Sequence, residues 1–147
     1  MPPFNLRIYT LADFNRAIHL DVKNGWYRYY RAQIAYLLHQ EDAFACDMDE
    51  AIELTKSARA SSSNEDENWV LDFNLALYQL FRMDYTEAWR LYDQLIATCP
   101  SLLSVRSVLE AVSDLLTVQR RNELAPHIQE QLCTRIAELE QSGASDK

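Results

Sequence analysis

The fold of this chain is decided by residues 69–100, which read WVLDFNLALYQLFRMDYTEAWRLYDQLIATCP. The spacing of leucine and aromatic residues predicts an amphipathic helix over residues 69–82 and a second one over residues 85–97. Residues 83–84 are the turn between them, and Pro100 marks the point where the second helix can no longer continue. A helix pair this short cannot bury both of its apolar faces alone, so other helices must pack against it.

The pattern of large and small residues in this stretch resembles a tetratricopeptide repeat, a helix–turn–helix unit of about 34 residues. Leu75 and Ala76 stand where the family has its Leu-Gly pair. The family's aromatic, small, aromatic and proline positions in the second helix and its exit are matched by Tyr85, Ala88, Tyr92 and Pro100. Leu95 departs from the pattern, because it replaces a second small residue and so shifts the helix crossing. The resemblance implies an all-α fold built as a right-handed stack of antiparallel helix pairs, a TPR-like α-solenoid.

A second sign of repetition lies in the first half of the chain. The sequence AIHL at residues 17–20 returns as AIEL at residues 51–54, one repeat length later. The predicted helix in residues 9–21 has one broad apolar face, made of Leu11, Phe14, Ala17, Ile18 and Leu20. It resembles the second helix of a repeat, with Phe14 and Ala17 in the aromatic and small positions. Too few residues precede it for a partner helix, so we expect the chain to begin with half a repeat.

The next expected repeat covers residues 25–58, and its second helix allows two alignments with the family pattern. In the first alignment, Phe44 and Met48 occupy the small and aromatic positions. In the second, Ala43 is the small residue and Cys46 is a single insertion. The residues alone do not decide between them.

Two further segments complete an expected single domain of residues 1–147. Residues 59–68 (RASSSNEDEN) are polar and acidic, which predicts a solvated loop inserted between two repeats. Ser63 or Asn64 is expected to cap the following helix, with Glu65–Glu67 at its N-terminus. Residues 101–142 are predicted to form a divergent helix pair that caps the stack, because an open end would expose apolar surface. Its helices are expected over residues 101–118 and 123–141, with a turn at residues 119–122 and Pro126 in the first turn of the second helix. With 2 Gly and 4 Pro, the chain has few residues that break helices, and about seven helices are expected.

The composition limits the classes of partner. A formal net charge of −8 and an isoelectric point near 4.8 argue against nucleic acid and against an anionic membrane surface. The three cysteines form no C-x-x-C pair, which predicts reduced, helix-packed thiols in a cytoplasmic protein. These cysteines are Cys46, Cys99 and Cys133. No apolar run approaches the length of a membrane span, and the first residues do not resemble a signal peptide.

No catalytic or metal-binding motif emerges from the residues. Two glycines exclude a glycine-rich phosphate loop, and the H-E-x-x-H, G-x-S-x-G and Glu-x-x-His patterns are absent from the sequence. His19, His39 and His127 are predicted to complete local electrostatics near helix ends. Glu123 and His127 are one turn apart and are predicted to form a surface pair, with a weak metal site that includes Cys133 as the alternative. We therefore expect no metal, no cofactor and no enzymatic activity.

The function that the resemblance implies is binding of a peptide or protein. In the resembled family, the first helices of successive repeats line a concave groove that holds the partner. Carried over position by position, this groove consists of Trp26, Tyr29, Gln33, Tyr36, Phe73 and Leu77, flanked by Val70 and Leu80. The basic and Asn positions with which some members clamp a C-terminal carboxylate are absent, so the expected groove is aromatic and apolar.

Two alternatives to this groove remain open from the residues. Aromatic side chains at helical spacing also suit a core covered by neighbouring helices. The second alternative is a structural piece of a larger repeat protein that forms a homodimer through apolar surface at Leu11 and Phe14.

Overall fold

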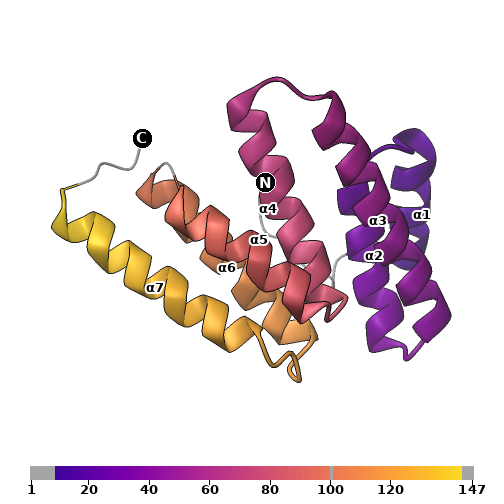
Figure 1. The fold of residues 1–147 in the computed structure, drawn as a ribbon. Helices are drawn as coiled ribbons and strands as arrows, with labels where there is room; N and C mark the ends of the chain where they lie inside the picture. The colour runs from indigo at the N-terminus through magenta and orange to yellow at the C-terminus, as the bar shows by residue number, and fades with distance from the viewer. Residues whose placement is uncertain (1–8, 100, 144–147) are drawn as a thin grey trace. The chain divides into compact units, whose positions relative to one another are not determined.

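The computed structural model describes residues 9–99 and 101–143, and in these ranges it contains helices and turns but no strand (Figure 1). The helices are α1 (Leu11–Leu20), α2 (Gly25–Leu37), α3 (Glu41–Ser61), α4 (Glu65–Phe81), α5 (Tyr85–Ala97), α6 (Leu102–Val118) and α7 (Ala125–Gln141). Helices that follow one another in the sequence pack as pairs. The predicted all-α class is therefore confirmed.

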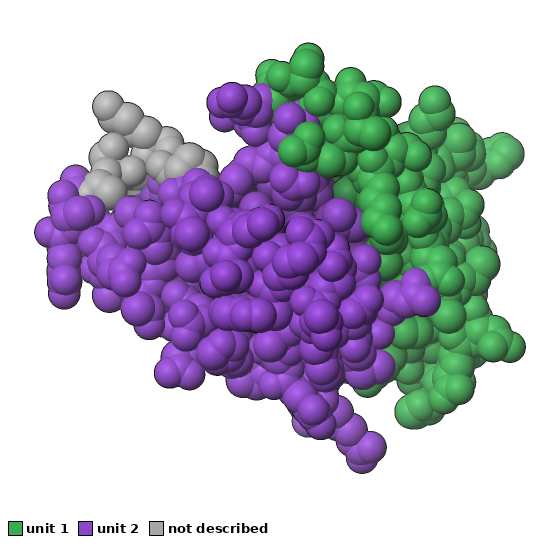
Figure 2. Space-filling model, viewed as in Figure 1, with its two compact units in different colours: residues 1–64 green, residues 65–147 purple. Residues whose placement is uncertain are grey.

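The helices group into two compact units (Figure 2). In the N-terminal unit, residues 1–64, α2 packs against both α1 and α3. In the C-terminal unit, residues 65–147, α4 pairs with α5, and α6 pairs with α7. The boundary between the units falls inside residues 59–68.

The loop predicted over residues 59–68 is shorter than expected, whereas the predicted position of Glu65–Glu67 at the start of the following helix is confirmed. Helix α3 continues through Ser61, and α4 begins at Glu65, so only residues 62–64 lie outside a helix. The segment contains neither glycine nor proline, and its alanines favour helix. The carboxylates that suggest a solvated loop are also favourable in the first turn of a helix, where they face the positive end of the helix dipole.

The α2–α3 and α4–α5 turns share one backbone geometry. His39 has a φ angle of 58° and Met83 one of 67°, so both residues adopt the left-handed conformation. In the first turn, the Gln40 N–H donates to the Ala35 carbonyl at 2.9 Å, and the equivalent bond in the second turn is 3.0 Å. These are the hydrogen bonds of a Schellman motif, which ends a helix and satisfies its last carbonyl groups.

The shared turn geometry decides between the two alignments of residues 25–58. It aligns the first residue of α3 with the first residue of α5, so that Phe44 takes the place of Ala88. Met48 then takes the place of Tyr92, and both of these side chains are completely buried. The structure therefore makes Phe44 equivalent to Ala88 and Met48 equivalent to Tyr92, as in the first alignment and without an insertion at Cys46.

Helix α1 begins with a capping box and buries one narrow face. The Thr10 hydroxyl accepts from the Asp13 N–H at 3.2 Å, and the Asp13 carboxylate accepts from the Thr10 N–H at 2.7 Å. Phe14 and Ile18 are buried, as predicted. Leu20, predicted to share their face, is 76% exposed, because two further residues turn the helix by about 200°.

In the C-terminal unit, the two hairpins lie side by side with equivalent helices adjacent: α4 contacts α6, and α5 contacts α7. The Tyr85 hydroxyl accepts from the Glu123 N–H at 3.1 Å. One turn further along both segments, the ring centroids of Trp89 and His127 are 4.9 Å apart. Because these contacts advance along the two segments together, α5 and α7 run parallel to each other.

Candidate functional site

The predicted groove residues lie on α2 in the N-terminal unit and on α4 in the C-terminal unit. Four of the six are buried, namely Tyr29, Gln33, Phe73 and Leu77. Trp26 and Tyr36 are half-buried. Of the flanking pair, Val70 is exposed and Leu80 is buried. On α2, the surface available to a partner at these positions is therefore limited to parts of two aromatic side chains.

The aromatic residues of α2 hold the N-terminal unit together. The Trp26 and Tyr30 rings stack at 5.5 Å between centroids, and Tyr30 stacks in turn on Phe14 of α1 at 5.8 Å. At the other end of α2, Tyr36 lies 5.6 Å from Phe44 of α3. These ring contacts favour the core alternative for much of this set, since they bury apolar area between neighbouring helices.

Arg31 links all three helices of the N-terminal unit. Its Nε and Nη2 donate to the two carboxylate oxygens of Asp47 on α3, at 2.8 and 2.6 Å. Its Nη1 donates to the Asn15 Oδ1 on α1 at 2.9 Å. Asp47 is buried, and its hydrogen bonds raise the pKa of the Arg31 guanidinium. A bidentate pair of this kind fixes the relative orientation of the two helices that carry it.

Arg28, one turn earlier on α2, makes a second link of the same kind. It is buried, and its Nη1 donates to the Val22 carbonyl in the α1–α2 turn at 2.7 Å. Its Nε lies 3.3 Å from the Glu50 carboxylate on α3. The charged residues of α2 are thus used to join the helices of their own unit.

A buried amide pair joins the α6–α7 connection to the end of α4. The Gln119 Nε2 donates to the Phe81 carbonyl at 2.8 Å, and the Asn122 Nδ2 donates to the Leu80 carbonyl at 2.7 Å. The last carbonyl groups of a helix have no hydrogen-bond partner within it, and these amides bond two of them in α4. The Leu80 carbonyl also accepts from the Met83 N–H at 3.0 Å. The Asn122 Oδ1 also accepts from the Ala125 N–H at 3.0 Å and thereby caps the start of α7.

Sequence reasoning missed this amide pair, because it assigns residues 119–122 only to a turn. Polar residues in a turn are ordinarily solvated, so the residue types gave no signal of burial. The predicted start of the last helix at residue 123 is also two residues early, since α7 begins at Ala125. Pro126 lies in its first turn, as predicted.

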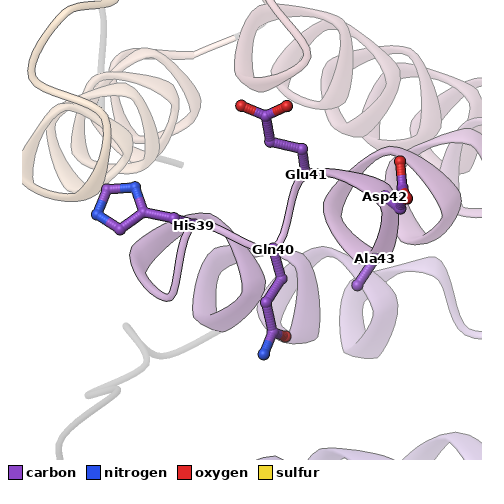
Figure 3. A pocket seen from close by; sticks show the side chains of 5 residues that line it. All are labelled: His39, Gln40, Glu41, Asp42 and Ala43. Atoms are coloured by element: carbon purple, nitrogen blue, oxygen red, sulfur yellow. The ribbon is translucent and has the colours of Figure 1, made fainter.

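The α2–α3 turn carries a shallow pocket that is open to solvent (Figure 3). Five consecutive residues line it: His39, Gln40, Glu41, Asp42 and Ala43. Their side chains diverge, with His39 on one side, Gln40 pointing away from Glu41, and Asp42 further along α3. Polar groups in a binding pocket ordinarily converge on the ligand, and these five side chains do not.

The three cysteines are free thiols that differ in exposure. Cys46 on α3 and Cys133 on α7 are exposed, so the prediction of helix-packed thiols is wrong for these two. Cys99, just after α5, is buried, and burial raises the pKa of its thiol. We therefore expect the exposed thiols to be the reactive ones.

Across residues 9–99 and 101–143, no group of three or more His, Cys, Asp or Glu side chains has an arrangement suited to a metal ion. His127, considered for such a site with Glu123 and Cys133, lies against Trp89 instead. None of the seven helices in these ranges combines the length and the apolar character needed to cross a bilayer.

Comparison with known proteins gives no relative: no family model, no curated protein and no solved structure matches the chain.

Proposed function

We propose that the chain is a non-catalytic protein–protein interaction module, a TPR-like adaptor or scaffold that binds a peptide or protein. The observation that carries this proposal is the packing in the C-terminal unit, where equivalent helices of two hairpins lie adjacent and α5 and α7 run parallel. Helical-repeat proteins build extended binding surfaces by repeating this packing step. The proposal includes an α-solenoid arrangement of the helix pairs and a cytoplasmic location, which the three free thiols support.

Trp26 and Tyr36 are the proposed partner contacts on α2, because they are the predicted groove residues there that keep exposed surface. Large aromatic side chains that are partly exposed supply much of the binding energy at protein interfaces. The buried Tyr29 ring lies against Trp26, with 5.6 Å between centroids, and holds it in place. The proposed partner segment is apolar or aromatic, since no basic clamp for a carboxylate stands at the equivalent positions.

The test compares Tyr36→Ala with Tyr27→Ala, a control on the same helix that is also a half-buried tyrosine but lies outside the proposed contacts. A partner is captured with the full chain from the source cells, and its affinity for each purified variant is measured by titration. We expect Tyr36→Ala to weaken binding about tenfold or more and Tyr27→Ala to change it less than about twofold. Thermal melting of each variant checks that both remain folded, and equal binding by all three proteins would refute the proposed contacts.

Self-association is a second candidate, and the exposed leucines of α1 favour it. Leu11 is 43% exposed and Leu20 is 76% exposed. The predicted dimer surface of Leu11 and Phe14 is wrong for Phe14, because that ring is buried against Tyr30. Light scattering over a range of concentrations tests this candidate: a dimer should dissociate with Leu20→Glu and persist with Leu103→Glu, an exposed leucine of α6. A monomer mass at every concentration rules it out.

A further inference from the structure

We draw no further inference here: the strongest candidate, the short segment of residues 62–64 followed by the carboxylates of Glu65, Asp66 and Glu67 at the start of α4, consists of a helix N-terminus and an acidic cluster, and nothing else in residues 9–99 and 101–143 indicates which molecule would bind or modify it.

Discussion

At the scale of single residues, the two left-handed turn positions are occupied by side chains that disfavour this conformation. His39 and Met83 both have positive φ angles at the residue that follows a helix, where glycine is the usual choice. We expect His39→Gly and Met83→Gly each to raise the free energy of unfolding by about 0.5–1 kcal/mol, since removal of the Cβ relieves the strain and the gain exceeds the added entropy of the unfolded chain. Urea denaturation measures the change.

The control for this prediction is His39→Ala, which removes the imidazole and keeps the Cβ. Because both His39 and Met83 are exposed, truncation alone costs little packing. We expect no gain in stability from His39→Ala, and a gain equal to that of His39→Gly would show that backbone strain is not the cause.

The Arg31–Asp47 pair is a bidentate link between α2 and α3 in the N-terminal unit. Asp47→Asn leaves the guanidinium without its counter-charge and breaks one of two hydrogen bonds to a buried group. Loss of one partner of a buried ion pair costs about 3–5 kcal/mol, and the partial exposure of Arg31 reduces the expected loss to about 2–3 kcal/mol.

The exposed pair Glu53–Lys56 on the same α3 provides the matched control. Glu53→Gln should change the free energy of unfolding by less than about 0.5 kcal/mol, because solvent screens both charges. Chemical denaturation of both variants checks the prediction. Equal effects of Asp47→Asn and Glu53→Gln would contradict it.

Two carboxyl groups should influence stability with opposite signs as the pH changes. Hydrogen bonds from the Thr10 backbone and hydroxyl lower the pKa of Asp13 below 3.8, so its contribution to stability is present above 3.8 and is lost as the pH falls through the lowered value. Partial desolvation by neighbouring side chains and the nearby Glu110 charge raise the pKa of Asp114 above 3.8 although its side chain is exposed, so its charged form weakens the folded state at neutral pH. This penalty disappears below pH 3.8.

The variants Asp13→Asn and Asp114→Asn separate these two effects. At pH 7 we expect Asp13→Asn to lower the free energy of unfolding and Asp114→Asn to raise it. Both differences from the wild type should shrink toward zero in acid. Denaturant titrations at a series of pH values measure them, and differences of the same sign at pH 7 would contradict the assigned causes.

At the scale of helices and turns, Gln119 and Asn122 act on two elements at once, because they satisfy the last carbonyls of α4 and start α7. Asn122→Ala should lower the free energy of unfolding by about 2–3 kcal/mol, since it removes a cap and leaves the buried Leu80 carbonyl without this donor. Arg121→Ala, an exposed neighbour in the same connection, should have an effect below about 0.5 kcal/mol. Urea denaturation compares the two, and an equally small loss for Asn122→Ala would contradict this role.

The positions of most helices could be predicted from the sequence, while their contacts could not. Apolar periodicity reports the face that each helix buries, and it correctly predicts Phe14 and Ile18 on α1 and the apolar face of α5. The amide pair at Gln119 and Asn122 leaves no periodic signal, because it binds backbone atoms of a helix far away in the sequence. The error at residues 59–68 has a different origin: serine and carboxylate residues suit both a loop and the two ends of a helix.

For the candidate groove too, the sequence indicates which side chains share a helix. It does not indicate which other helices cover them. The sequence places Trp26, Tyr29 and Tyr36 on one helix, but exposure depends on which helices pack against it. The structure buries Tyr29 and leaves Trp26 and Tyr36 partly accessible. Side-chain type alone could not distinguish these positions, because an aromatic ring suits both a core and an interface.

At the scale of the whole molecule, the repeat pattern does not predict the division into two compact units. A repetition such as AIHL and AIEL indicates that two helices have similar side chains on one face. It does not indicate where along the chain one compact unit ends and the next begins. The C-terminal unit has a core of its own among α5, α6 and α7. Its completely or almost completely buried members include Tyr92, Val105, Val112, Ile128 and Leu132.

We therefore expect residues 65–147 to fold when expressed alone. Helices α5, α6 and α7 bury a common apolar core, and the amide pair that satisfies α4 comes from the same unit. The isolated unit should show helical circular dichroism and a single cooperative urea transition. Leu132→Ala in the isolated unit provides the control, because loss of a buried leucine side chain should lower its free energy of unfolding by about 2–5 kcal/mol. A broad, non-cooperative transition that Leu132→Ala leaves unchanged would show that the core of this unit forms only in the full chain.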